Sequence, residues 1–403
     1  MILRKHLATA AVTAALLGTT ATTAVAQPAE SASASASASA AQQLRRDTEA
    51  IHDLGISGVQ ARAIGPDGRQ AVATSGTADL TTGRPVDPDG YFRMASTSKA
   101  LVATVVLQLE AEGRLSLDDT VDHWLPGLVH TDGKGNGKDG RDVRIRDLLQ
   151  HTSGITDDGL PGYDSPASYY AKRHDVYEPE QLVGFAMAHP AAGTWTYSNT
   201  GYVLLDLIIQ KATGRPAHRE VQDRIVRPLG LDRTRWTGTS PTLPRPHARA
   251  YQYYGPDFGP DARLDVTDQV PVDHENLAWV TTTRDENLFL RALLGGRLLP
   301  ARQLAEMKHT VAVSPALKEL WGDAGYGLGL VKRGLTCGGD YWGHEGGDGG
   351  FITLNGVTED GRRSAVVSMS EARGDTLDHI KDQEKAASAL IDHALCAGAP
   401  GTR

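Results

Sequence analysis

The stretch MASTSKALVATVVLQLEAEG (residues 94–113) begins with small and hydroxyl residues, carries one lysine and continues as an apolar run of helical character. If Ser96 begins a helix, Lys99 lies one turn later on the same face and its amine can contact the serine hydroxyl. A serine becomes a nucleophile when a neighbouring base takes its proton, and a desolvated lysine can act as that base. The alternative is an N-cap serine followed by a surface lysine.

Two later stretches supply candidate partners for this pair. GTWTYSNTGYVLL places Tyr197 and Asn199 before a helix, although both residue types are also common in turns and caps. DYWGHEGGDGGF places His344 in a glycine-rich strand, where it is either a surface-loop histidine, a metal ligand with Asp348, or part of a catalytic site. No second histidine stands nearby at ligand spacing, so we expect no metal site.

Length and composition indicate an ordinary globular protein. The chain has 403 residues, of which 40% are hydrophobic and 22% charged, so it can bury a large core. The formal net charge is −8, which argues against nucleic acid or an anionic membrane surface as a partner. Apart from the N-terminal segment, no apolar run is long and uncharged enough to span a bilayer.

The N-terminus predicts export. Residues 1–26 read as a signal peptide, with a basic start, an apolar middle and a small-residue cleavage site, although a membrane anchor is the alternative. Residues 27–41 are Ser/Ala-rich and are predicted to be a flexible linker or a trimmed pro-segment. The catalytic domain is expected over residues 42–398, with a tail at 399–403, in a secreted, extracellular protein.

An exported chain with two cysteines, Cys337 and Cys396, favours a disulfide over two buried thiols. In the chain-entropy model such a bridge stabilises the fold by roughly 4 kcal/mol.

Secondary-structure signals are unevenly distributed along the chain. Two strands around a Pro-Asp-Gly turn stand near the start, helical spacing dominates from Ser96 to Arg302, and strands followed by a long helix close the chain. This order predicts an α+β fold in which both termini build one sheet and a helical lobe is inserted between them.

Taken in order, Ser-x-x-Lys, Tyr-x-Asn and His-x-Gly resemble the three motifs of the serine penicillin-recognising enzymes, the family of DD-carboxypeptidases, class C β-lactamases and related esterases. VRIRDLLQHTSGI and YGLGL are also similar to that family, and the Cys337–Cys396 pair matches a disulfide of its secreted carboxypeptidases. The resemblance covers roughly residues 42–397. It implies a β-lactamase/transpeptidase-like α/β sandwich, with an antiparallel sheet flanked by helices from both termini and an inserted all-helical lobe.

The resemblance also implies catalytic roles. Ser96 is the expected nucleophile, and Lys99 holds and tunes its hydroxyl. Tyr197 is expected to shuttle the proton, with its pKa lowered by Lys99. Asn199 is expected to bind Lys99 and the substrate amide, and His344 to fix Tyr197.

The oxyanion hole is expected to consist of the backbone N–H groups of Ser96 and Gly347. The implied reaction is acyl transfer through an acyl-serine, and it needs no cofactor. The chain lacks the G-x-S-x-G elbow of the α/β-hydrolases.

The predicted substrate-binding residues depart from the carboxypeptidase pattern. Glu345 and Gly346 complete the third motif, where those enzymes usually carry a hydroxyl in the middle position. Val331 replaces an arginine that grips the substrate carboxylate, and Lys332 or Arg333 is the candidate substitute, although strand alternation sends neighbours to opposite faces. A segment that is usually small contains residues expected to crowd the pocket: Asp273, Glu275 and Trp279.

The charge of Glu345 leaves two alternatives open. A carboxylate facing a substrate carboxylate at about 4 Å would cost roughly 4 kcal/mol at an effective dielectric near 20, whereas it would attract an ammonium group. Alternatively Glu345 points away, or pairs with Lys99, Lys332 or Arg333.

The predicted function is that of a serine hydrolase most like a D-alanyl-D-alanine carboxypeptidase, acting on peptide or amide bonds of D-amino acids. The alternatives are a D-aminopeptidase or D-amino acid amidase, an esterase, a β-lactamase, or a binding protein without turnover. The expected partners are small molecules or peptides with D-amino acids, including peptidoglycan stem peptides or β-lactams.

Overall fold

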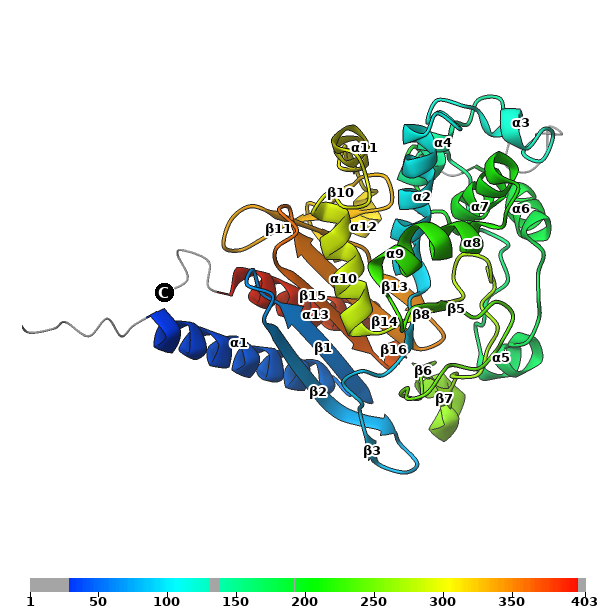
Figure 1. Ribbon diagram of the computed structural model, residues 1–403. Helices are drawn as coiled ribbons and strands as arrows, with labels where there is room; N and C mark the ends of the chain where they lie inside the picture. Colours follow the sequence, from blue (N-terminus) through cyan, green and yellow to red (C-terminus); the bar gives the residue numbers. More distant parts are fainter. Residues whose placement is uncertain (1–28, 131–137, 192, 398–403) are drawn as a thin grey trace, which may run out of the picture.

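The computed structural model describes residues 29–130, 138–191 and 193–397 (Figure 1). The predicted signal peptide (1–26) and tail (399–403) lie outside these residues. In the part of the chain that is described, no helix is long and apolar enough to cross a membrane. The fold is an antiparallel sheet with helices on both faces and a helical lobe beside it, as the sequence predicted.

The main sheet has ten strands among the described residues, in the order β3-β2-β1-β15-β14-β12-β11-β10-β9, with β13 paired to β14. Its centre joins the two ends of the chain, because β1 pairs antiparallel with β15. Every residue of β15 is buried, since helices cover both faces of the sheet there. The strands are β1 (Gly58–Ile64), β2 (Gln70–Asp79), β3 (Arg84–Pro85), β9 (Val311–Ala312), β10 (Gly325–Tyr326), β11 (Val331–Gly334), β12 (Asp340–Gly343), β13 (Gly346–Asp348), β14 (Phe351–Thr358) and β15 (Ser364–Met369).

One face of the sheet is covered by helices from both termini. Helices α1 (Ala29–His52) and α13 (Leu377–Cys396) pack against each other on this face. On the opposite face, α10 (Thr283–Leu294) packs against β1, β14 and β15. The first helix begins at Ala29, so the described part of the predicted linker is helical rather than a flexible tether. Alanine has the highest helix propensity of all residues, which favours extending the packed part of α1 toward its N-terminus.

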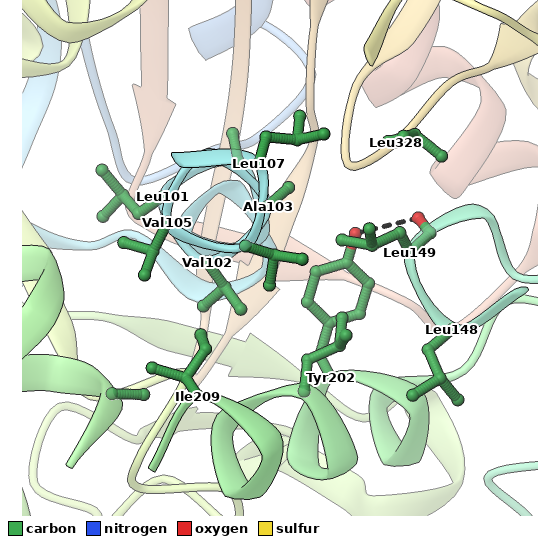
Figure 2. Close-up of a cluster of buried hydrophobic side chains, with 14 of the residues drawn as sticks. Leu101, Val102, Ala103, Val105, Leu107, Leu148, Leu149, Tyr202, Ile209 and Leu328 are labelled. Carbon is green, nitrogen blue, oxygen red and sulfur yellow. Dashed lines mark hydrogen bonds between the residues drawn. The ribbon is translucent and has the colours of Figure 1, made fainter. Parts of the chain in front are cut away.

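The helical lobe is built around α2 (Lys99–Ala111), which is buried along almost its whole length (Figure 2). Leu101, Val105 and Leu107 belong to the same core cluster as Tyr202 and Ile209 of α7. The Tyr202 hydroxyl donates a hydrogen bond to the backbone carbonyl of Leu149 at 3.0 Å. This packing fixes the start of α2 relative to α7.

Shorter elements complete the fold. Two three-stranded sheets, β4-β8-β5 and β16-β6-β7, lie among the described residues. Their strands are β4 (Phe92–Arg93), β5 (Arg235–Trp236), β6 (Tyr251–Tyr253), β7 (Arg263–Asp265), β8 (Trp279–Thr281) and β16 (Glu371–Arg373). The other helices are η1 (Ala95–Ser98), α3 (Val121–Trp124), α4 (Ile145–Gln150), α5 (Pro166–Lys172), α6 (Pro179–Met187), α7 (Asn199–Thr213), α8 (Ala217–Val221), η2 (Gln222–Val226), α9 (Arg227–Leu229), η3 (Pro256–Asp261), α11 (Ala301–Met307) and α12 (Pro315–Trp321).

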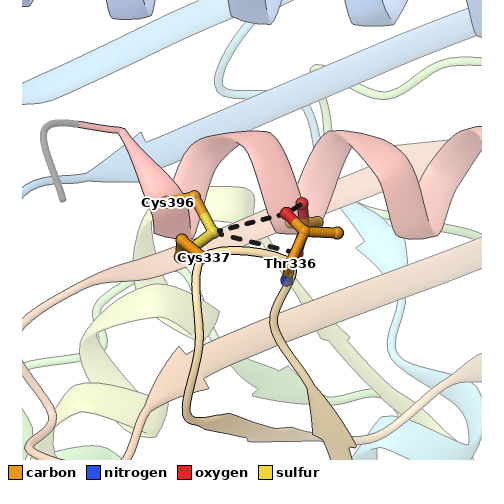
Figure 3. Close-up of a disulfide and its surroundings, with 4 residues drawn as sticks. Thr336, Cys337 and Cys396 are labelled. Atoms are coloured by element: carbon orange, nitrogen blue, oxygen red, sulfur yellow. Dashed lines mark hydrogen bonds between the residues drawn. A yellow bond between two sulfur atoms is a disulfide. The ribbon is translucent and has the colours of Figure 1, made fainter. Parts of the chain in front are cut away.

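The predicted disulfide is confirmed in the structure. Cys337, in the connection between β11 and β12, is bonded to Cys396 at the end of α13, with their Cα atoms 5.8 Å apart (Figure 3). Thr336 reinforces the junction, because its backbone N–H donates to Asp392 of α13 at 2.8 Å. The bridge therefore holds the end of the last helix against the β11–β12 connection.

Candidate active site

Ser96 lies on a short helical turn that leads into α2. It is the only residue from Tyr91 to Leu107 that is not buried, so the chain exposes this one position of a core segment. Ala95 before it has a φ of +50°, which costs a non-glycine residue about 1 kcal/mol. A strained backbone directly before a partly exposed serine is a feature of functional sites.

Lys99 is fully buried at the first residue of α2, and its amine contacts two of the predicted site residues. Its Nζ donates to Ser96 Oγ at 3.1 Å and to Asn199 Oδ1 at 2.7 Å. The same Nζ lies 5.1 Å from the centre of the Tyr197 ring and 5.3 Å from that of Tyr202. The structure thus brings together Ser96, Lys99, Tyr197 and Asn199.

Burial lowers the pKa of Lys99 from 10.5 to about 8, while the carboxylates of Asp273, Asp157 and Asp206 oppose this shift. Desolvation disfavours the charged amine, and nearby negative charges favour it. Burial and the Asp273 carboxylate also raise the pKa of Asp206 well above its ordinary value. A substantial fraction of Lys99 is therefore neutral in mildly alkaline solution.

The expectation that Lys99 lowers the pKa of Tyr197 is wrong. Burial raises the pKa of the Tyr197 phenol above its ordinary value, and the nearby Ser96 hydroxyl only partly offsets this rise. The Tyr197 hydroxyl is buried and makes no hydrogen bond of normal geometry among the described residues. Tyr197 is therefore a neutral phenol beside Ser96, and Lys99 is the group that can be deprotonated near neutral pH.

His344 lies in the site but bonds to a different tyrosine from the one expected. Its Nδ1 lies 2.6 Å from the carbonyl oxygen of Glu345, and its Nε2 lies 2.8 Å from the Tyr326 hydroxyl. Burial, followed by Lys99 and Arg333, lowers the His344 pKa well below its ordinary value, so the ring is neutral. Nδ1 must then donate to the carbonyl and Nε2 accept from Tyr326. The Tyr197 ring centre is 6.2 Å away and is not held by a hydrogen bond from His344.

His151 is a site residue that the sequence did not single out. It is fully buried at the end of α4, and its ring centre lies 4.3 Å from that of Tyr197. Its Nδ1 accepts the backbone N–H of Ser198 at 3.1 Å, and burial lowers its pKa well below the ordinary value. The neutral His151 ring therefore packs against the Tyr197 ring and helps to fix its position.

Asp157 is a second missed residue. Its carboxylate accepts the backbone N–H of Asn199 at 2.7 Å and the Asn199 side-chain amide at 2.9 Å. It also accepts the backbone N–H and the hydroxyl of Thr200 at 2.9 and 3.0 Å. Asp157 thus caps α7 and turns the oxygen of Asn199 toward Lys99. A lone aspartate in a loop carries no periodic signal that the sequence could show.

We expect Asp157→Ala to lower kcat about tenfold and the free energy of unfolding by about 1–3 kcal/mol, because five donors, including the Ser198 hydroxyl, lose one acceptor group. Asp157→Asn keeps one acceptor oxygen and should fall between wild type and alanine in both measurements. Steady-state kinetics and urea denaturation provide the test. Lower stability with an unchanged kcat would show that Asp157 caps the helix without orienting Asn199.

The third motif approaches Ser96 closely. A Cβ on Gly346 would lie 2.3 Å from the Met94 carbonyl oxygen, so only glycine lets β13 reach η1. Beside this contact is a cleft of about 520 Å³. Its lining includes Ser96, Tyr197, His344, Glu345, Gly346 and Gly347, together with apolar residues of α12. We call it the active cleft.

Glu345 lines the active cleft but is not free. Its carboxylate accepts from the Arg333 guanidinium and from Trp321 Nε1, the latter at 2.8 Å. Arg333 also donates to Glu384 of α13 at 2.8 Å. Of the two alternatives for Glu345, pairing with Arg333 is the one observed. Glu384, which also lines the cleft, was not identified from the sequence.

Three predicted substrate-binding residues do not line the active cleft. Trp279 is buried in the core of the helical lobe, and Val331 is buried in β11. Lys332 points to the other side of the sheet, where it pairs with Asp340 at 2.7 Å. Alternation along β11 explains why neighbouring side chains separate in this way.

The other two residues expected to crowd the pocket are also elsewhere. Asp273 is buried, and its carboxylate acts on the charge of Lys99. Glu275 pairs with His218 at 2.9 Å. In the described residues no group of three or more His, Cys, Asp or Glu side chains is placed to hold a metal ion.

Comparison with known proteins agrees with this geometry. Penicillin-binding protein 4 of Amycolatopsis lactamdurans is 30% identical over 76% of this chain and 80% of its own length. Penicillin-binding protein 4* of Bacillus subtilis is 35% identical, but the match spans about a third (34%) of that protein. A solved D-stereospecific amidohydrolase from Streptomyces sp. is 36% identical with a TM-score of 0.74, covering 85% of this chain and 98% of that one. D-amino acid amidase from Ochrobactrum anthropi SV3 is 26% identical with a TM-score of 0.73, over 89% and 98%.

The family model described as Beta-lactamase matches residues 14–390, which is most of the chain. Together with the serine-lysine pair at the start of α2, this match shows that the chain belongs to the Beta-lactamase family of serine hydrolases.

Proposed function

We propose that this protein hydrolyses amide and peptide bonds formed by the carboxyl group of a D-amino acid that carries a free amine. The observation that carries the proposal is that the two cations beside the third motif already have ion-pair partners within the protein. Lys332 is paired with Asp340, and Arg333 is held between Glu345 and Glu384. Neither is free to grip a substrate carboxylate. The similarity to a D-stereospecific amidohydrolase and a D-amino acid amidase supports the same proposal.

The proposed reaction begins at Ser96. Neutral Lys99, 3.1 Å away, takes the hydroxyl proton as Ser96 Oγ bonds to the substrate carbonyl carbon. The backbone N–H groups of Ser96 and Gly347 receive the negative oxygen. Tyr197 gives its proton to the leaving nitrogen as the C–N bond breaks, and the proton held by Lys99 replaces it on the phenol. The products of this step are an acyl-serine ester, a free amine and a neutral Lys99. Water then attacks this ester while neutral Lys99 takes one of its protons, and Lys99 returns that proton to Ser96 Oγ as the acyl C–O bond breaks and the D-amino acid leaves.

This proton path predicts a pH dependence. We expect kcat at saturating substrate to rise with an apparent pKa of about 8, because only neutral Lys99 accepts the Ser96 proton. Asp273, whose own pKa is raised to about 6, is ionised in this range and favours the charged amine. Asp273→Asn should therefore move the rising limb to lower pH, whereas Asp53→Asn, at an exposed site, should not. A limb that stays in place in Asp273→Asn would contradict the assignment to Lys99.

The charge of the cleft suggests which substrates it accepts. Glu345 and Glu384 share the Arg333 guanidinium, so this three-residue group carries one negative charge in excess, while Arg373 adds a positive charge elsewhere in the lining. An ammonium group is attracted to such a site and a carboxylate is repelled. The apolar side chains Leu317, Leu320 and Ile352 line the same cleft and suit an apolar amino acid side chain.

A D-alanyl-D-alanine carboxypeptidase is the second candidate. Arg373 lines the active cleft and is the cation best placed to bind a terminal carboxylate there. Its Nη1, however, already donates to the Leu54 carbonyl at 2.9 Å, at the end of α1. The likeness to penicillin-binding protein 4 of A. lactamdurans favours this candidate. We also propose that the protein is exported from the cell, a location that both candidate functions would share.

The test compares two substrates with the purified protein and uses Ser96→Ala as the blank. One substrate is D-phenylalanine p-nitroanilide with a free amine, and the other is an N-acetylated peptide ending in D-Ala-D-Ala with a free carboxylate. We expect kcat/KM to be at least about tenfold higher for the first, the effect of roughly 1.4 kcal/mol. Preference for the second would overturn the proposal and favour the carboxypeptidase.

The variant Glu384→Gln isolates the charge argument. It removes the negative charge in excess and should reduce the preference for a free amine over an N-acetylated amine on the same anilide. Glu319→Gln removes a carboxylate that does not line the active cleft and serves as the matched control. An unchanged preference in Glu384→Gln would show that the cleft charge does not select the substrate.

A further inference from the structure

A second cleft lies directly beside the active cleft. It measures about 710 Å³ and lies between the end of α12, the β11–β12 hairpin and α13. Leu320, Trp321 and Glu384 line both clefts, so the two share a wall. Nothing in the reaction at Ser96 requires this second space.

The shared wall is a layer of interlocked side chains. Trp321 Nε1 donates to Glu345 at 2.8 Å, and the Arg333 guanidinium lies 5.4 Å from the centre of the Trp321 ring. Arg333 is tied to Glu384, which also accepts from Ser388 Oγ at 3.1 Å. Because these groups hold one another, the wall is a fixed surface over which a substrate chain can pass.

One face of α13 supplies most of the far side of the second cleft. Lys381, Lys385, Ser388, Ala389 and Asp392 recur at helical spacing and line it. Lys381 is paired with Glu319 across the cleft at 3.2 Å. Lys385 is exposed, and among the described residues it has no ion-pair partner.

The acidic groups that line this cleft differ in whether they already have a partner within the protein. Both oxygens of Asp392 accept from Thr336, and Glu384 is held by Arg333. Asp323, beside α12, has no ion-pair partner within the described part of the chain. Counting the described residues alone, a chain lying here meets one free cation on α13 and one free carboxylate beside α12. This arrangement suits a peptide with its own N–H groups and a terminal carboxylate.

We infer that the second cleft binds the C-terminal part of a peptide substrate, whose terminal carboxylate pairs with Lys385 while its D-amino acid end is cleaved at Ser96. This inference rests on the proposed function and extends it, because it makes longer peptides better substrates than amides. The negative charge of the Glu345–Arg333–Glu384 wall disfavours a carboxylate directly after the scissile bond. A longer leaving group carries its carboxylate past that wall.

The experiment measures kcat/KM for D-phenylalanine amide and for peptides in which D-phenylalanine is followed by one to four glycines. Each peptide is made with a free carboxylate and with a carboxamide terminus. We expect the longer acids to exceed their carboxamides about threefold to fivefold, the effect of one exposed ion pair. Lys385→Ala should abolish this ratio and leave amide hydrolysis unchanged, whereas Lys211→Ala, at an exposed site on α7, should change neither.

A second variant tests occupancy of the cleft rather than charge. Ala389→Trp fills the second cleft and should lower kcat/KM for all longer peptides while sparing the amide. If Lys385→Ala keeps the ratio and Ala389→Trp spares the peptides, the inference is wrong although the proposed function stands. If wild type does not hydrolyse the amide, the proposed function fails and the inference fails with it.

Discussion

Lys99→Ala is expected to lower kcat by about a thousandfold, within the range that a general base contributes, and to change KM by only a few fold. The Lys99 amine is the group nearest to Ser96 Oγ whose pKa lies close to neutrality. Without it, the serine proton has only the neutral phenol of Tyr197 beside it, and burial has raised the pKa of that phenol. Removing Lys99 also leaves the buried Asp206 and Asp273 without their nearby cation.

Steady-state kinetics on D-phenylalanine p-nitroanilide, together with thermal unfolding, separate the loss of the base from a loss of folding. Lys172→Ala, in α5 and away from the cleft, is the matched control. Tyr197→Phe should be less severe than Lys99→Ala if the lysine takes the proton first. A Lys99→Ala variant that keeps kcat within tenfold of wild type would contradict this order.

Replacing both cysteines, Cys337→Ser with Cys396→Ser, is expected to lower the free energy of unfolding by about 4 kcal/mol. The bridge joins residues 59 positions apart, and without it the unfolded chain gains the freedom of that open loop. In the folded protein the same bridge ties the end of α13 to the β11–β12 hairpin (Figure 3). Urea denaturation at equilibrium measures the difference.

Reduction supplies an independent check on this prediction. A reducing agent should destabilise the wild type by a similar amount and have no effect on the doubly substituted variant. Kinetics measured below the unfolding transition should change little, because neither cysteine lines the active cleft. A loss of stability below about 1 kcal/mol would mean that the hairpin and α13 are held by their other contacts.

The arrangement of the fold could be predicted because its signals are local and regular. Strand patterns at both ends of the chain and helical spacing between them were enough to predict one sheet built from both termini and a helical lobe inserted between them, and the pairing of β1 with β15 joins the two ends in that sheet. Helical spacing made the Ser96–Lys99 contact one of two alternatives, and the structure shows that contact. The meeting of that pair with Tyr197 and Asn199 followed from the resemblance to a family.

Contacts that depend on the register between strands could not be predicted. The sequence left the partner of Glu345 open between Lys99, Lys332 and Arg333, and it gave no sign that His344 would meet Tyr326. Their meeting depends on which residues of β10, β11 and β12 lie opposite one another, and a single chain carries no record of that. Asp157 was missed for a related reason, because a loop carboxylate is recognised as a cap only when the helix it caps is in place.

The measurement that tests the central claim most directly is acid quenching during turnover of a D-phenylalanine ester, followed by mass spectrometry of the digested protein. An acyl-serine mechanism predicts a D-phenylalanyl adduct on the peptide that contains Ser96, and neither adduct nor turnover in Ser96→Ala. An adduct on another residue, or turnover that persists in Ser96→Ala, would contradict the account.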